Sequence, residues 1–248
     1  MPRPIASFQL SGRGYRDRPS LLDPALSLFA SGTGADFLRY SEMYSSLAAS
    51  HLVGVAVYGP QNQGPKNKNA RDVHERFEAL MERVESVPEP FMSLEDLKTC
   101  RDWKMVRNRV RQNWLLVNEN SDSVVKKVTS SAFSELDDGD WEAAMSTLTK
   151  GLAGVGPATA SIILTLRDPK VPFFGEEVIR VCGLKDKSYN ERSYREFSDL
   201  MAEKARELDV ELTPRDMERA VWAAVYQGSK DDHNAEEQPS AKKRKKNK

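Results

Sequence analysis

The hydrophobic positions of this chain recur mainly at spacings of three and four residues, a pattern that predicts helices over most of its length. Near the start, Leu26 and Phe29 share one face behind Asp23-Pro24, a pair typical of a helix N-terminus. The same spacing predicts further helices over residues 35–50, 70–86, 93–117, 121–134, 139–151, 157–167, 190–208 and 213–227.

Other local signals mark helix starts and interruptions. Ser93 with Asp96, and Thr213 with Asp216, resemble capping boxes in which Asp replaces the usual Glu. Residues 51–58 alternate in a β-like manner, and residues 60–69 have the composition of a loop. Because the helical signals dominate, the expected fold class is all-α.

Composition divides the chain into three parts. Residues 1–19 are rich in Pro, Gly, Ser and Arg and lack an apolar period, which predicts a flexible N-terminal arm. From Asp231 onward the sequence is polar and of low complexity. We therefore expect one all-α domain over residues 20–228, followed by a disordered basic tail over residues 229–248.

The inventory of chemically reactive residues excludes several classes of protein. Cys100 and Cys182 are too few for a disulfide framework, and the histidines at 51, 74 and 233 lie far apart. This predicts no zinc site and no iron–sulfur cluster. No apolar run approaches the roughly 20 residues that cross a bilayer, so no membrane association is expected and the protein should be soluble and intracellular.

Charge is balanced over all 248 residues, with 37 basic and 37 acidic side chains, but it is unevenly distributed. Residues 98–127 carry eight basic and three acidic groups, a local excess that suits a polyanion. The run Lys242-Lys243-Arg244-Lys245-Lys246 predicts recognition by a nuclear import receptor, and hence localisation in the nucleus. A solubilising or non-specific DNA-binding tail is the alternative.

Residues 148–161 are the most informative segment. Gly154-Val155-Gly156 predicts a tight reversal between two helices, and Pro157 suits the first position of the second helix. Backbone N–H groups at such a helix start favour a phosphate oxygen, so Gly154, Gly156 and Thr159, with Lys150 before the turn, are predicted to contact DNA. The alternative is a corner that serves packing only.

The basic cluster upstream predicts a second set of DNA contacts. Lys104, Arg107 and Arg109 lie in a segment that we expect to be helical, where a polar stripe could follow phosphates. The alternative is a solvated helix face whose charges pair with Glu95, Asp96 and Asp102.

Leu152-x-Gly154-Val155-Gly156-Pro157-x-Thr159-Ala160 resembles the helix-hairpin-helix signature of the base-excision DNA glycosylase superfamily, of the endonuclease III type without its iron–sulfur cysteines. Two later segments, ending in Arg180-Val181 and in Asp216–Trp222, are similar to the same superfamily and follow in its order. The resemblance covers residues 140–182 best. It implies a two-lobed helical fold, double-stranded DNA as partner and, in active members, hydrolysis of the N-glycosidic bond of damaged or mismatched bases.

Two departures from the superfamily pattern limit the expected chemistry. Ala158 stands where bifunctional members have a lysine, so an active enzyme would be monofunctional. The resemblance also implies that such an enzyme uses no metal and no organic cofactor. The position of the family's aspartate falls on Gly175, which leaves Glu176 and Glu177 as candidates for the charge that stabilises an oxocarbenium-like state.

Glu176 is the favoured candidate and is expected to face the cleft, with Glu177 at the helix terminus and the neighbouring Phe173 and Phe174 lining a pocket. Two alternatives remain, a member that binds DNA without catalysis and a helical adaptor whose hairpin binds protein.

Overall fold

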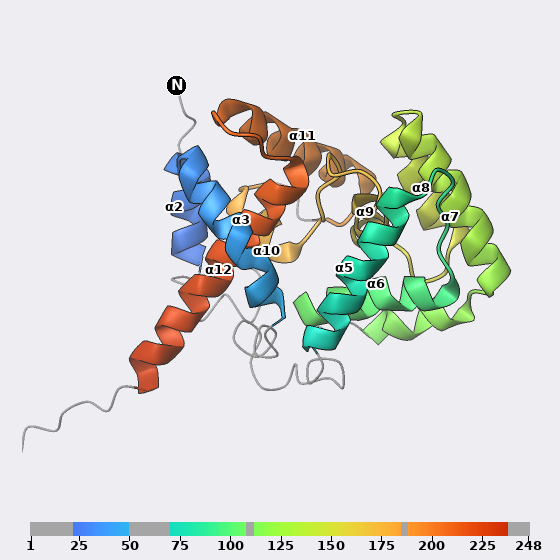
Figure 1. Ribbon diagram of the computed structural model, residues 1–248, viewed down its shortest axis with the longest axis horizontal. Helices are drawn as coiled ribbons and strands as arrows, with labels where there is room; N and C mark the ends of the chain where they lie inside the picture. The colour runs from blue at the N-terminus through green and yellow to red at the C-terminus, as the bar shows by residue number, and fades with distance from the viewer. Residues whose placement is uncertain (1–21, 50–69, 108–111, 185–187, 238–248) are drawn as a thin grey trace, which may run out of the picture.

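The computed structural model describes residues 22–49, 70–107, 112–184 and 188–237, with side chains left out at residues 112–114 and 228–237. This described part is helical and contains no strand, which confirms the all-α fold class (Figure 1). The arm over residues 1–19, the β-like stretch 51–58 and the loop 60–69 lie outside the described residues, as do Arg109 and the lysine-rich run Lys242–Lys246.

The helices follow one another in the order α2 (Asp23–Ser31), α3 (Gly34–Ala48), α5 (Ala70–Ser86), α6 (Leu94–Arg107), the 3-10 helix η4 (Gln112–Glu119), α7 (Asp122–Asp137), α8 (Trp141–Gly151), α9 (Pro157–Thr165), α10 (Glu176–Val181), α11 (Glu191–Glu207) and α12 (Pro214–Glu237).

Polar side chains cap the helix starts as the sequence predicts. The Ser93 N–H donates to Asp96 at 2.7 Å and the Asp96 N–H donates back to the Ser93 hydroxyl at 3.2 Å. Thr213 and Asp216 make the same pair of bonds at 3.0 and 3.2 Å. Each box satisfies backbone donors that the first helical turn leaves open, so both predicted capping boxes are confirmed.

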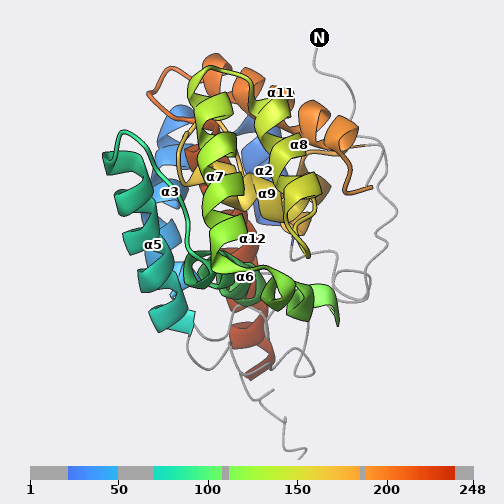
Figure 2. The same cartoon turned by 90° about the vertical axis from the view of Figure 1, so that its right-hand side faces the viewer.

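The first and last described helices pack together. α12 lies along α2 and α3 and also contacts α10 and α11, whereas α7 and α8 form an antiparallel pair at the other end of the molecule (Figures 1 and 2). α6 lies between these groups and contacts α5, α7, α9 and η4. Its Trp103 ring stacks on Phe77 of α5 with ring centroids 4.1 Å apart, within one continuous apolar core.

Two predicted helix boundaries are wrong. The helix expected over residues 93–117 ends at Arg107, and η4 follows from Gln112. The last helix, expected to stop near residue 227, continues to Glu237 and so extends into the segment predicted to be a disordered tail. Among the described helices, none has the length and apolar character that a membrane crossing demands.

Candidate nucleic-acid interface

The hairpin predicted from the glycine pattern is present. α8 ends at Gly151, residues 152–156 reverse the chain, and α9 begins at Pro157 with Gly156 as its N-cap (Figure 2). The Val155 N–H donates to the Leu152 carbonyl at 3.4 Å and closes the turn. Lys150, Gly154 and Gly156 are all exposed, so the tip of the hairpin is open to solvent.

The two glycines of the turn serve different purposes. Gly154 has a φ of +75°, and a Cβ there would lie 2.9 Å from the Val117 backbone nitrogen of η4. Gly156 has an extended backbone, and a Cβ there would meet no atom within 4 Å. Gly154 is therefore required by the fold itself, whereas only Gly156 offers open space that a ligand could enter.

Asn120 fixes the turn to the segment that follows η4, a contact that the sequence analysis missed. Its side-chain amide donates to the Ala153 carbonyl at 3.0 Å and accepts from the Ala153 N–H at 2.9 Å. The same amide nitrogen donates to the Val117 carbonyl at 2.9 Å. Because Asn120 is only 9% exposed, these bonds hold the turn against η4 in a site screened from water.

Lys104 and Thr159, predicted separately as DNA contacts, lie together. The half-buried Lys104 extends from α6, and its Nζ donates to the Thr159 hydroxyl at 2.9 Å. Thr159 lies in the first turn of α9 and is itself buried, so it orients the lysine and does not face solvent. An ammonium group thereby lies beside the positive end of a helix dipole, and both favour an anion.

Arg107 does not belong to this surface, and its prediction as a DNA contact is corrected. Its side chain is 2% exposed and makes two hydrogen bonds to Glu218 of α12, at 2.7 and 3.2 Å. The guanidinium lies 4.5 and 4.8 Å from the ring centroids of Trp222 and Trp103. It is an internal connection between α6 and α12, out of reach of a phosphate.

The two candidate catalytic glutamates both lie in the first turn of α10 and differ in exposure. Glu177 is 2% exposed and points into the core, where its charge acts on Arg107. Glu176 is the outer residue and pairs with Arg180 one turn later, at 2.7 Å. Glu177 lies in the first turn of α10, at the helix terminus where it was expected, but it is buried there.

Phe173 and Phe174 are core residues. Phe173 packs edge-on against Trp103, and Phe174 contacts Tyr194 and Phe197. Both rings are about 2% exposed or less, so the expectation that they line an open pocket is wrong.

Two neighbouring leucines on η4 are exposed next to the hairpin. Leu115 is 54% exposed and Leu116 is 39% exposed. Leu116 lies against the turn, since a Cβ on Gly154 would come within 3.1 Å of it. The sequence analysis missed them because it placed residues 93–117 in one helix, where their orientation toward the turn could not be inferred.

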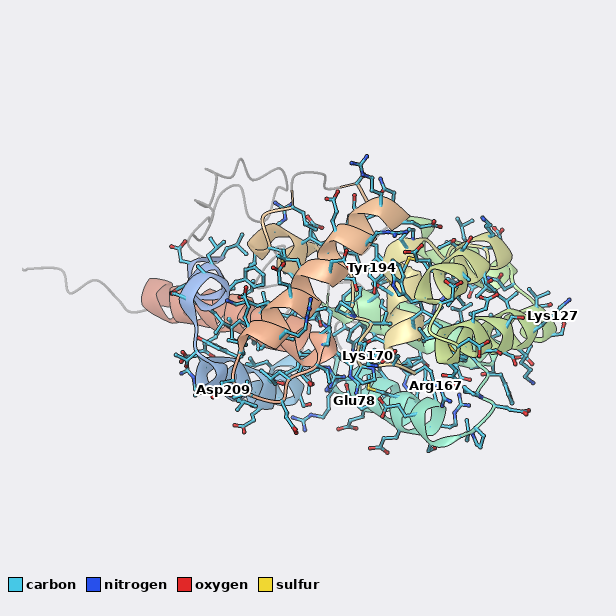
Figure 3. All side chains as sticks on the ribbon, turned by 90° about the horizontal axis from the view of Figure 1, so that it is seen from above. Glu78, Lys127, Arg167, Lys170, Tyr194 and Asp209 are labelled. Carbon is cyan, nitrogen blue, oxygen red and sulfur yellow. The ribbon has the colours of Figure 1, made fainter. Side chains whose placement is uncertain are left out.

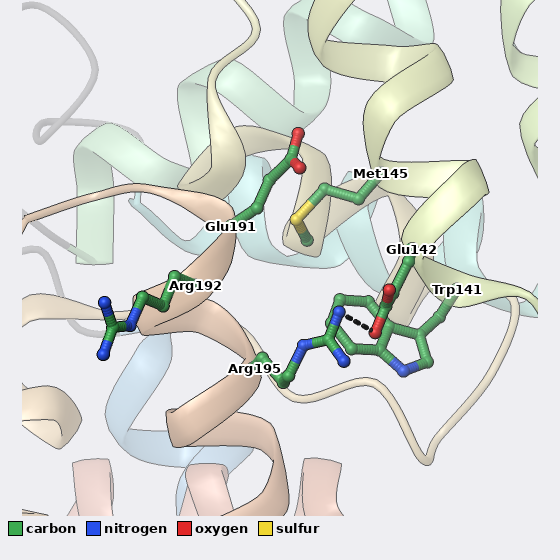
Figure 4. A pocket seen from close by; sticks show the side chains of 6 residues that line it. All are labelled: Trp141, Glu142, Met145, Glu191, Arg192 and Arg195. Carbon is green, nitrogen blue, oxygen red and sulfur yellow. Dashed lines mark ion pairs between the residues drawn. The ribbon is translucent and has the colours of Figure 1, made fainter.

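A pocket of about 310 Å³ opens at the other end of α8, between the starts of α8 and α11 (Figure 4). Arg195 pairs with Glu142 at 2.5 Å and lies 5.9 Å from the centroid of the Trp141 ring. The positive and negative side chains that line the pocket therefore neutralise each other, so the pocket does not favour an ionic ligand.

No metal site emerges from the described residues, where no three His, Cys, Asp or Glu side chains converge. The candidate site therefore consists of the exposed hairpin tip, Lys104 at the first turn of α9, and the exposed Leu115 and Leu116 of η4. Comparison with protein families, with curated protein sequences and with solved structures gave no match.

Proposed function

We propose that the protein binds double-stranded DNA through the hairpin tip, with the α9 N-terminus at Gly156 receiving a backbone phosphate. The observation that carries the proposal is the coincidence of open space at Gly156 with the Lys104 ammonium group at the first turn of α9. Phosphate binding at a helix N-terminus uses the same backbone N–H groups and dipole. Lys150 adds a positive charge at the same exposed tip.

The exposed leucines extend this surface beyond the phosphates. Proteins that approach DNA from the minor groove often combine phosphate contacts with an apolar side chain that wedges between bases. Leu115 and Leu116 supply that chemistry next to the turn, and Asn120 fixes the distance between the two. The surface therefore suits distorted or easily unstacked duplexes better than a uniform one.

The residues at the superfamily's catalytic positions favour a protein that binds DNA without catalysis over an active glycosylase. Ala158 and Gly175 replace groups used by catalytic members of the superfamily that the sequence resembles. Glu176 is already paired with Arg180, and Glu177 is buried beside the Arg107 cluster. Base excision by Glu176 or Glu177 remains the second proposal, and the helical adaptor remains the third. Nuclear localisation through Lys242–Lys246 is proposed on the sequence alone.

A matched set of variants tests DNA binding. Gly156→Leu fills the open space at the tip without changing charge. Gly151→Ala, on the same hairpin, brings a Cβ to 2.8 Å from Val128 of α7, so it is the comparison variant in which packing is disturbed and the tip is left unchanged. We expect Gly156→Leu to weaken duplex binding at least tenfold while its circular dichroism matches wild type. Unchanged affinity would refute the hairpin as the contact. A parallel panel of lesion-bearing duplexes should show no base release, and release that is lost in Glu176→Gln or Glu177→Gln would establish the catalytic alternative.

A further inference from the structure

A second surface, distinct from the hairpin, is a groove between α3 and α5. Its volume is about 550 Å³. α5 contributes three carboxylates, Glu75, Glu78 and Glu82, against the single guanidinium of Arg71, while α3 contributes the hydroxyl groups of its last turns. Glu78 lies where α5 meets the C-terminal helix (Figure 3) and pairs with Arg219 at 3.1 Å. Glu75 and Glu82 are exposed, so the groove is acidic and favours a cationic occupant.

His74 also lines this groove, and its imidazole is left without a hydrogen bond. The residue is 4% exposed, and neither ring nitrogen has a partner within the described structure. Its Nδ1 lies 3.9 Å from the Glu78 carboxylate. Burial, with the charges of Arg219 and Arg107, lowers the pKa of His74 to about 4, so the ring is neutral near pH 7. A neutral imidazole can accept from an ammonium group, and a buried polar atom without a partner is costly.

We propose that this groove binds the chain's own lysine-rich run, Lys242–Lys246. The run is the most concentrated positive charge in the sequence, and the groove carries the complementary charge next to an unused hydrogen-bond acceptor. Docking inserts lysine ammonium groups beside Glu75 and Glu82 and brings one within reach of His74. The occupant is a basic peptide segment, recognised by charge.

The path of α12 brings the run within reach of the groove. Trp222 of α12 packs on Tyr44 of α3 with ring centroids 5.5 Å apart, which fixes where α12 passes the groove. From Trp222 to Glu237 the helix extends by about 22 Å. From Glu237 an extended chain spans about 17 Å to Lys242 and about 30 Å to Lys246, so the last residues of the run can return along that length.

Docking would withhold these lysines from other acidic partners. An import receptor and the DNA phosphates would each compete with the groove for the same charges, so the groove would regulate the proposed nuclear import. The docking contact itself does not depend on DNA binding by the hairpin, and its test contains no DNA.

Carbodiimide coupling of the full-length protein tests the contact, because it joins a lysine amine to a carboxylate only when the two touch. At low ionic strength we expect amide cross-links within one molecule from the Lys242–Lys246 run to Glu75 or Glu82, and a severalfold loss at high salt. Glu75→Gln with Glu82→Gln should remove them. Glu203→Gln, at an exposed carboxylate of α11, is the matched control and should leave them unchanged.

Three results would overturn the proposal. They are cross-links spread evenly over exposed carboxylates including Glu203, the absence of any cross-link from the run, and cross-links formed only between isotopically light and heavy copies of the protein.

A second experiment follows the resonances of the His74 ring by NMR. Its resonances should shift when the run is neutralised by lysine-to-glutamine changes, and should not shift when Lys127, which lies on α7 far from the groove (Figure 3), is changed instead.

Discussion

Lys104 and Arg107 lie three residues apart on α6, carry the same charge, and have opposite environments. Lys104 is half-buried and reaches the hairpin, where its Nζ bonds to Thr159. Arg107 is enclosed by aromatic rings and bound to Glu218 of α12. The comparison teaches that a basic residue on a helix cannot be assigned to a polyanion contact from local sequence alone, because an acidic residue from a distant segment, such as Glu218, can hold it in the core.

The choice of residue type agrees with the two environments. A guanidinium is planar, donates two parallel hydrogen bonds to a carboxylate and stacks on aromatic faces, so it suits a buried position better than lysine. Burial alone would lower the pKa of Arg107, but the charges of Glu218 and Tyr44 and the hydrogen bond to Glu218 raise it overall, so the guanidinium stays charged. The compact ammonium of Lys104 suits a site that exchanges with solvent and with a mobile anion.

The largest expected effect is the loss of the buried partner. Arg107→Met leaves the buried Glu218 side chain without its partner, which should lower the free energy of unfolding by about 3–5 kcal/mol. Lys104→Met, the matched change on the same helix, should cost less than about 1 kcal/mol. Chemical denaturation of both variants measures the difference.

The pair Arg107→Met with Glu218→Leu sharpens this comparison. Because no charge is left uncompensated, the double variant should recover most of the lost stability. Equal stability of the two single variants would contradict the distinction between an internal and a surface cation.

The two glycines of the hairpin give the next largest contrast. Gly154→Ala forces a Cβ into a backbone with φ of +75° and against η4, so we expect a stability loss of about 1–3 kcal/mol. Gly156→Ala should leave the unfolding free energy within about 0.5 kcal/mol and act on DNA affinity instead. Thermal unfolding, read beside duplex binding, separates the two roles. A stable Gly154→Ala protein would show that the turn is not held as described.

Most of the fold could be predicted from the sequence, because helix spacing and capping are local properties. The capping box of Ser93 and Asp96 predicts the start of α6 without knowledge of any tertiary contact. The hairpin was also predictable from its glycines and proline. The burial of Arg107 was not, since Glu218 lies 111 positions away and no local pattern links the two. For the same reason the sequence could not show that η4 leaves no room for a side chain at Gly154, or that Asn120 holds the turn through its hydrogen bonds to Ala153.

A smaller effect is expected from acid. The pKa of His74 is about 4 in the folded protein and close to 6.5 when unfolded, so the unfolded state binds the proton more tightly. The stability contributed by the neutral ring is therefore complete above pH 6.5 and is lost as pH falls toward 4. His74→Phe should flatten the decline of unfolding free energy across this window. A decline as steep as that of wild type would assign the acid sensitivity to other groups.

The salt dependence of duplex affinity tests the central claim most directly. Each phosphate neutralised by a lysine contributes about −0.9 to the slope of log affinity against log salt concentration. If the hairpin binds phosphate, wild type should show a negative slope, and Lys104→Ala should make it shallower by about one unit while weakening binding equally for all sequences. Affinity that does not change with salt, or a slope that Lys104→Ala leaves unaltered, would contradict the account.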